Sequence, residues 1–337
     1  MQPLRVRVVS VLGIALGAPV TAEFLQAYLS STGDALAILG GLLFFAPLYG
    51  GAALLIREVA VRTRRGWTGI LLLAAAFGVA MPGVIDLALF GTQRADIPYW
   101  AALREPTLIE PLQISAFATL SWVIGHVMMS VGAPLAVHQA LASSTRGRPI
   151  LGRWGIGILI VLWAIIALLV HTDGRQTYGY VPSGWQVAGV LLVVAGLVAL
   201  AMSRVGRPVA SRPDGGPVPV AAILAAGAVA KVSFDLLPPT WTGFAVGTAL
   251  LLCVGVLLRW LSARCRWHSR EIGLLGAAVI VGGAVIGFAS PVPDGVPVLA
   301  KFAQNAVMLL LAFALAAAVY RRSARQAPLT SQQPGDV

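Results

Sequence analysis

Ten apolar stretches, each long enough to cross a lipid bilayer, dominate this chain and restrict the folds open to it. A transmembrane helix needs roughly 20 mostly apolar residues. Inside lipid every backbone polar group must be bonded within the protein, so such stretches form helices. The sequence therefore predicts an all-α, polytopic membrane bundle of about ten transmembrane helices. We expect these at 8–29, 35–56, 68–90, 113–141, 154–171, 186–203, 218–236, 241–260, 272–290 and 298–320.

The arginines between these stretches fall on alternate sides of the predicted membrane. Nineteen lie at the two ends of the chain or after even-numbered stretches, whereas Arg94, Arg104 and Arg175 lie after odd-numbered ones. Cytoplasmic loops carry the excess of basic residues, so both termini are predicted to be cytoplasmic (N-in, C-in). Richness in arginine, alanine, glycine and valine is typical of a bacterial protein, and we expect the bacterial cytoplasmic membrane.

The net charge of +11 does not indicate a nucleic-acid-binding protein. The basic residues form short clusters between apolar stretches instead of one polar face, and membrane topology explains that pattern. Charged residues make up only 11% of the chain, against about 25% in soluble proteins. The expected partners are the lipid bilayer and a small-molecule or ion substrate, and a partner subunit is left open.

Two polar connections divide the chain. Residues 91–112 are predicted to form a long external loop, with Tyr99 and Trp100 as anchors at the membrane interface. Residues 204–217, rich in proline, glycine and arginine, are typical of a flexible cytoplasmic linker. The predicted parts are thus six helices in 1–203, four helices in 218–322, and a disordered cytoplasmic tail in 323–337.

The first apolar stretch has a second interpretation. Arg5 and Arg7 precede it, and Val20-Thr21-Ala22 resembles a signal-peptidase site. The apolar run continues well beyond that site, which favours retention as a transmembrane helix.

Ionisable residues inside the apolar stretches are candidates for a functional site, because each costs about 2.5–3.5 kcal/mol to insert at a helix centre. Asp86 follows Met81-Pro82-Gly83, where the proline is expected to kink the third helix and open a polar pocket. The alternative is a carboxylate at the water interface. His126 lies near the middle of the fourth helix and could relay protons or bind a ligand. The alternative is a neutral histidine satisfied by a neighbouring helix.

Lys231 and Asp235 are four residues apart and share one face of the seventh helix, either in a site or as a stabilising pair. Lys301 opens the tenth helix and Glu23 lies near the outer end of the first, where each could simply extend toward the interface. These residues share the outer third of the predicted membrane. We therefore expect one water-filled vestibule, open to the outside, lined by Glu23, Asp86, Lys231, Asp235 and Lys301 and floored by His126.

Two short patterns resemble motifs of the CAAX protease and bacteriocin-processing family of intramembrane proteases. Arg57-Glu58-Val59-Ala60-Val61-Arg62 is similar to its Glu-Glu-x-x-x-Arg motif, with arginine for the first glutamate. Trp122-Val123-Ile124-Gly125-His126 is similar to Phe-x-x-x-His, with tryptophan for phenylalanine. The family's His-x-x-x-Asn motif has no counterpart, since Ala142 stands four residues after His138. The resemblance implies Glu58 as a base that activates water and His126 as its partner or a metal ligand. From the residues alone, Arg57, Glu58 and Arg62 form a salt-bridged turn at the interface.

The number of helices, the chain length and the cytoplasmic ends resemble the drug/metabolite transporter superfamily, which implies transport. The sequence holds no Cys/His metal spacing, nucleotide-binding loop or Gly-x-Ser-x-Gly pattern, so neither a metal nor a cofactor is expected. The favoured function is a transporter or permease with an outward-facing polar vestibule, and an enzyme is less favoured. The alternatives are a protease-like intramembrane enzyme, active or degenerate, and a non-catalytic subunit of a larger membrane complex.

Overall fold

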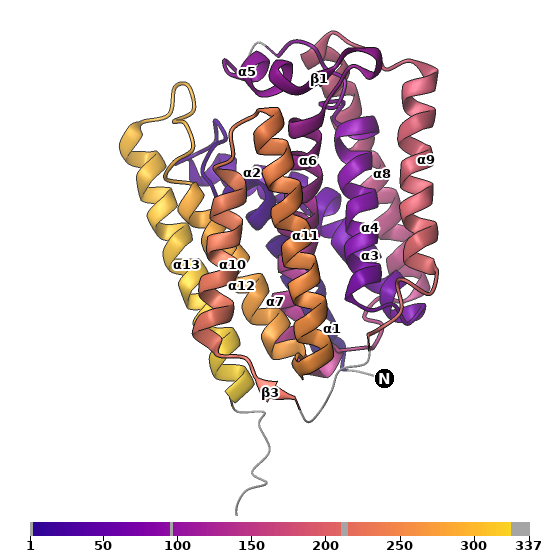
Figure 1. Ribbon diagram of the computed structural model, residues 1–337, viewed down its shortest axis with the longest axis vertical. Helices are drawn as coiled ribbons and strands as arrows, with labels where there is room; N and C mark the ends of the chain where they lie inside the picture. The colour runs from indigo at the N-terminus through magenta and orange to yellow at the C-terminus, as the bar shows by residue number, and fades with distance from the viewer. Residues whose placement is uncertain (1–2, 95–96, 210–214, 325–337) are drawn as a thin grey trace, which may run out of the picture.

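Helices make up almost all of the computed structural model, which describes residues 3–94, 97–209 and 215–324. Within these residues nine helical spans are long and apolar enough to cross a membrane, and each overlaps a predicted stretch (Figure 1). The all-α, multi-helix fold class is therefore confirmed. In chain order the spans are Leu4–Phe24, Ala35–Arg62, Trp67–Ile85, Ala116–Leu141, Arg153–Tyr178, Gly184–Met202, Trp241–Arg264, Ser269–Ile286 and Val298–Arg322.

The remaining predicted stretch, 218–236, forms the shorter helix α10 (Val220–Asp235) of 16 residues. A straight helix of this length measures about 24 Å, against roughly 30 Å of hydrocarbon in a bilayer. α10 nevertheless lies along α12 within the bundle. It is thus a packed helix of the bundle that is too short to cross a typical membrane by itself.

The first four spans are each built from α-helical and π-helical pieces. The other long helices are continuous. The pieces are α1 (Leu4–Pro19) and η1 (Val20–Phe24); α2 (Ala35–Phe45), η2 (Ala46–Gly50) and α3 (Gly51–Arg62); α4 (Trp67–Ala80) and η3 (Met81–Ile85); and α6 (Ala116–Gly125), η6 (His126–Gly132) and α7 (Ala133–Leu141). The continuous helices are α8 (Arg153–Tyr178), α9 (Gly184–Met202), α11 (Trp241–Arg264), α12 (Ser269–Ile286) and α13 (Val298–Ala324).

The first and third predicted helices end clearly earlier than expected. The first stops at Phe24 and the third at Ile85, and soon afterwards Ala27 and Leu87 have φ values of 51° and 66°. A left-handed residue cannot continue a right-handed helix. The predicted ends at 29 and 90 are therefore wrong, and Asp86 lies just past the end of its helix.

The predicted external loop is an ordered cap at one end of the bundle. It contains α5 (Trp100–Arg104), two 3-10 turns (Glu105–Thr107 and Glu110–Leu112), and a small antiparallel pair, β1 (Leu108–Ile109) with β2 (Ile114–Ser115). Trp100 is buried and stacks on Trp122 of α6 with ring centroids 5.6 Å apart, so its expected place at the interface is wrong. Tyr99 is exposed.

The bundle has two main apolar cores. One is formed by the first six spans and includes Ile14, Leu48 and Val131. The other joins α7 to α10, α12 and α13 and includes Val137 and Leu274. α12 packs against α7, α10 and α13, so the fourth span links both cores. α1 contributes Ile14 to the first core.

The described residues of the predicted linker make specific contacts. The Gly66 N–H donates to the Gly206 oxygen over 2.9 Å. Further on, β3 (Gly216–Pro217) pairs in parallel with β4 (Cys265–Arg266). The central residues of the linker, 210–214, and the predicted tail from 325 lie outside the described residues.

The polar loops gather at two opposite ends of the bundle (Figure 1). At the end that we call the basic end, Arg7 Nε donates to the Ile150 oxygen over 2.8 Å, and Arg65 Nη1 donates to the Ser203 oxygen over 2.8 Å. The start of α1 and the end of α13 lie there in Figure 1. α5 and β1 lie at the other end, which we call the loop end. This arrangement matches the alternation of arginines along the sequence.

The sides of the bundle are apolar. Trp154, Leu168, Leu192, Leu252 and Val256 on α8, α9 and α11 are all more than half exposed. An apolar surface of this extent would be costly in water and suits lipid. Fold and surface together define a multi-pass membrane protein.

Candidate functional site

Four π-helical segments occur within the described part of the chain, one in each of the first four spans. Each has a proline at or beside it: Pro19, Pro47, Pro82 and Pro134. A proline lacks an N–H and clashes with the carbonyl one turn earlier, which disrupts regular α-helical bonding. The wider π turn accommodates that defect, and such turns are frequent at functional sites. η6 contacts η1, η2 and α4, so three of the four irregular turns meet at one place.

Glu23 of η1 lies where these turns meet. Its two carboxylate oxygens accept hydrogen bonds from different tyrosines, Oε1 from the Tyr49 hydroxyl of η2 and Oε2 from the Tyr28 hydroxyl. Tyr49 is buried, whereas Tyr28 is partly exposed. The carboxylate is therefore held by two neutral donors between the end of the first span and the middle of the second.

Tyr49 connects Glu23 to His126 of η6. The Tyr49 and His126 rings stack with centroids 5.9 Å apart and planes inclined by 22°. Phe77 of α4 contacts the His126 ring edge-on, with ring centroids 5.5 Å apart. The His126 Nδ1 lies 3.1 Å from the Ser130 hydroxyl one turn on. His126 is thus fixed by aromatic rings from two neighbouring spans.

A close approach of α4 makes this packing possible. A Cβ atom on Gly78 would lie only 2.9 Å from the Val123 oxygen and 3.3 Å from the His126 Cβ. Glycine therefore lets α4 lie directly against α6 and η6, and brings Phe77 to the imidazole. Small residues at helix interfaces have this role in membrane bundles.

Asp86 lies on the loop-end side of this cluster. Its Oδ1 accepts the Ala88 N–H over 2.8 Å, which forms an Asx turn directly after η3. Arg94 of the loop lies within electrostatic range of both Asp86 and Glu23. The Arg94 guanidinium also donates to the Tyr178 hydroxyl over 2.8 Å. Glu23, Asp86 and His126 are therefore three predicted site residues that the structure brings into one region.

The structure places Lys231 and Asp235 elsewhere. The two side chains form an ion pair on α10, and the Lys231 Cβ would be 2.9 Å from a Cβ added at Gly282 of α12. The pair thus belongs to the interface between α10 and α12. The sequence predicted that this pair lines the same vestibule as Glu23. Its position between two packed helices instead favours a separate, stabilising role.

Lys301 is fully buried within the protein, so its ammonium does not reach water. Its ammonium donates to three backbone oxygens, those of Gln26, Ala27 and Gly287, over 2.9, 3.1 and 2.9 Å. It therefore bonds to the chain just beyond Glu23 without entering the Tyr49–His126 cluster.

Glu58, the other candidate from the sequence, is paired in full. Its Oε1 accepts from Arg57 Nη1 at 2.9 Å and from the Ile150 N–H at 2.8 Å, and its Oε2 lies 3.0 Å from Arg62 Nη2. Only nine residues separate Tyr49 from Glu58, but they amount to about 13 Å of helix. Glu58 is thus an anchor for the loop at the basic end, at a different depth from His126.

Among the side chains that the structure describes, no three His, Cys, Asp or Glu groups come close enough together to hold an ion. The two cysteines, Cys253 and Cys265, are free thiols.

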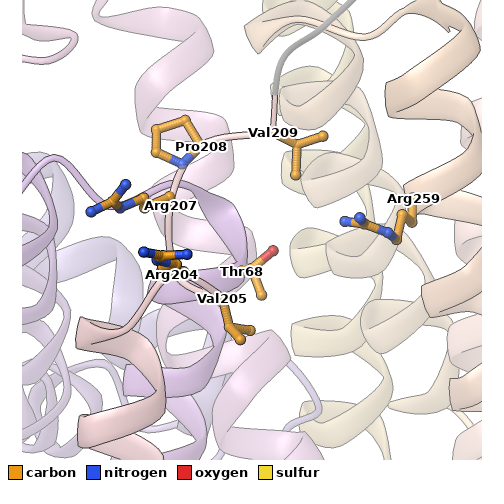
Figure 2. Close-up of a pocket in the computed structure, with 7 residues that line it drawn as sticks. All are labelled: Thr68, Arg204, Val205, Arg207, Pro208, Val209 and Arg259. Atoms are coloured by element: carbon orange, nitrogen blue, oxygen red, sulfur yellow. The ribbon is translucent and has the colours of Figure 1, made fainter.

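A cavity of about 410 Å³ lies at the basic end, apart from the Glu23–His126 region. Figure 2 shows Arg259 of α11 approaching it from the side opposite to Arg204 and Arg207. The other lining residues are Thr68, Val205, Pro208 and Val209. Three guanidinium groups around one opening give it a positive potential, as expected for the arginine-rich side of a membrane protein.

Comparison of the chain with protein-family models, with curated proteins and with solved structures finds no match in any of the three. The assignment to the class of multi-pass membrane proteins therefore rests on the sequence and the fold.

Proposed function

We propose that the protein is a proton-coupled transporter or permease, in which Glu23 takes up and releases the proton. The observation that carries the proposal is the bonding of the Glu23 carboxylate to two tyrosine hydroxyls at the end of a membrane span. A carboxylate held by neutral donors can change its charge without leaving a bonded arginine unpaired. Glu58, held by Arg57 and Arg62, cannot. Ionisable groups with this freedom are typical of proton pathways through membranes.

The stack of Tyr49 on His126 supports a coupled movement. A change of charge at Glu23 alters its bond to the Tyr49 hydroxyl, and the Tyr49 ring bears on the imidazole of η6. Because η1, η2 and η6 are all irregular turns, small rotations there cost fewer regular hydrogen bonds than in a continuous α-helix. Protonation of Glu23 would thus change contacts in the first, second and fourth spans together.

The proposed orientation puts the basic end in the cytoplasm of a bacterium and the loop end outside. Glu23, Asp86 and Arg94 then form a polar entry on the outer side, with His126 deeper in the membrane. A small molecule or ion is the proposed substrate. The two carboxylates and the guanidinium at this entry would select it by charge.

Infrared difference spectroscopy of the purified full-length protein tests the protonation step. Between acid and neutral pH the wild type should show the carbonyl band of a protonated carboxyl group, and Glu23→Gln should lose part of it. Glu110→Gln, which changes an exposed carboxylate of the loop, is the matched control and should keep the Glu23 contribution. An unchanged spectrum in Glu23→Gln would contradict the assignment.

Proteoliposomes with a pH-sensitive dye inside test the coupling. A panel of small cations, anions and neutral metabolites is added outside, and proton entry that depends on one compound identifies a substrate. Entry should be lost in Glu23→Gln and kept in Glu110→Gln. Substrate-driven proton entry that survives in Glu23→Gln would remove Glu23 from the mechanism.

A further inference from the structure

The Lys301 ammonium lies in a cage of oxygens formed by three separate segments of the chain. Gln26 and Ala27 follow the end of the first span, Gly287 caps the end of α12, and Lys301 itself is in the first turn of α13. The three bonds of 2.9–3.1 Å use all three donors of the ammonium. The carbonyls come from backbone that leaves a helix, where they have no intrahelical partner.

The geometry of the cage is that of a site for a small monovalent cation. Backbone carbonyls at the ends of broken membrane helices replace the hydration shell of such ions. The C-terminal end of a helix also carries partial negative charge, and both the first span and α12 end at this cage. All three ligands of Lys301 are neutral oxygens, so the cage matches a single positive charge.

Two further features point to a cation site and not to an incidental set of hydrogen bonds. Ala27 has φ of 51°, a left-handed conformation that is unusual for alanine, and its oxygen is one of the ligands. Asn305, one turn after Lys301, is fully buried and donates through Nδ2 to the Gly287 oxygen over 2.8 Å. The Asn305 Oδ1 is buried without a hydrogen-bond partner. This oxygen lies beside Gly287 and accepts no hydrogen bond.

We propose that the oxygens of Gln26, Ala27 and Gly287 form a monovalent-cation site whose resident ion is the Lys301 ammonium, and that the unbonded Asn305 Oδ1 is a further ligand for an ion that replaces the ammonium. The protein thereby carries its own tethered cation, which joins the ends of the first span, α12 and α13. Gln304 reinforces this junction, because it accepts from the Gly33 N–H at 3.0 Å and donates to the Phe24 oxygen at 3.2 Å. The inference stands whether or not Glu23 carries a proton.

The proposal predicts that emptying the cage creates a need for a dissolved cation. Lys301→Ala removes the ammonium and leaves its space, whereas Lys301→Met removes the charge but fills the space with an apolar chain. Thermal unfolding of the purified full-length variants is measured in sodium, potassium, ammonium and choline chloride at equal ionic strength. Choline is too large for the cage and reports the effect of salt alone.

We expect Lys301→Ala to unfold at lower temperature than the wild type in choline, and to regain stability saturably in sodium or ammonium. The regain should be about 5 °C at a cation concentration roughly a hundredfold above Kd. The wild type and Lys301→Met should not distinguish sodium or ammonium from choline. Adding Asn305→Leu to Lys301→Ala should weaken the response, because one ligand is lost.

A second variant covers the case in which Lys301→Ala does not fold. Lys301→Ser leaves similar space, because its hydroxyl ends near the position of the lysine Cγ, so it should respond to the cations as Lys301→Ala does. The proposal is overturned if both small variants respond to sodium and ammonium no more than to choline, or if Lys301→Met responds as they do. The proposal is also overturned if Lys301→Ala and Lys301→Ser fold in none of the four salts. Dissolved sodium or ammonium should occupy the emptied site and restore folding.

Discussion

At the scale of single residues, two glutamates of this chain, the buried Glu58 and the half-buried Glu23, have opposite environments. Glu58 is held by two arginines and a backbone N–H at the basic end. Glu23 is held by tyrosine hydroxyls. The bonding partners, and not burial alone, decide whether such a carboxylate can change its charge. The bonding of Glu58 is that of a structural group, whereas the bonding of Glu23 is compatible with the proposed proton step.

This difference predicts that Glu58→Gln destabilises the protein. The substitution leaves the buried Arg57 guanidinium without its counter-charge, although Arg57 keeps its bonds to the Thr145 and Arg148 oxygens. We expect a loss of about 3 kcal/mol in the free energy of unfolding, measured by denaturation of the purified protein. Glu110→Gln, at an exposed site, is the control. Equal stability of the two variants would show that the ion pairs contribute nothing.

The sequence identified the charged members of the site and missed the neutral ones. Glu23, Asp86 and His126 stand out because ionisable groups are rare and costly in a membrane span. Tyr49 and Phe77, which position His126, carry no such cost and look like any other aromatic residue in an apolar stretch. The contacts of Lys301 were equally hidden, because its ligands are backbone oxygens that no side chain marks.

At the scale of elements, prolines predicted bends but not their form. The sequence placed a kink at Pro82, and the structure has a π-helical turn there. It also has such turns beside Pro19 and at Pro47, where no irregularity was expected. Whether a proline yields a kink, a wide turn or a helix end depends on what packs against the freed backbone groups. That packing involves segments far apart in the sequence, so the local sequence does not reveal it.

α12 offers an element-scale prediction, because glycines let it lie directly against α7. A Cβ at Gly276 would be 2.7 Å from the Ala136 Cβ and 3.1 Å from the Ala133 oxygen. Gly276→Leu should therefore force the helices apart and cost about 1–3 kcal/mol of unfolding free energy. Gly255→Leu on α11 is the matched control, since nothing lies within 4 Å of its added Cβ.

Thermal unfolding in one detergent compares the two glycine variants. The midpoint should fall for Gly276→Leu and stay near that of the wild type for Gly255→Leu. A similar fall in both would mean that leucine disturbs the helices through their own backbone and not through the contact between α12 and α7.

At the scale of the whole molecule, hydrophobic length and arginine position predicted most of the architecture. Nine predicted stretches correspond to full-length spans, and the loops that the arginines grouped together do share one end of the bundle. α10 escaped this reasoning because its apolar run includes non-helical residues at both ends, so that only 16 residues are helical. The approach of α7 to α12 was not predictable, since it depends on contacts between distant segments.

The orientation of the molecule in the membrane follows from the same arginines and can be tested through its two cysteines. Cys265 lies in β4 at the basic end, whereas Cys253 is exposed on the apolar surface of α11. A maleimide that cannot cross membranes needs water at the thiol, so Cys253 should not react. If the basic end is cytoplasmic, Cys265 should react in inverted vesicles and not in intact cells.

A cysteine introduced at the loop end provides the complementary labelling test. Glu110→Cys in a Cys265→Ser background lies on the exposed part of the loop-end cap, so it should react in intact cells. Cys265→Ser alone should react in neither preparation. Labelling of Cys265 from outside, with protection of the cysteine at 110, would reverse the orientation. The polar entry at Glu23 and Asp86 would then face the cytoplasm, and the proposed vestibule would receive its substrate from inside.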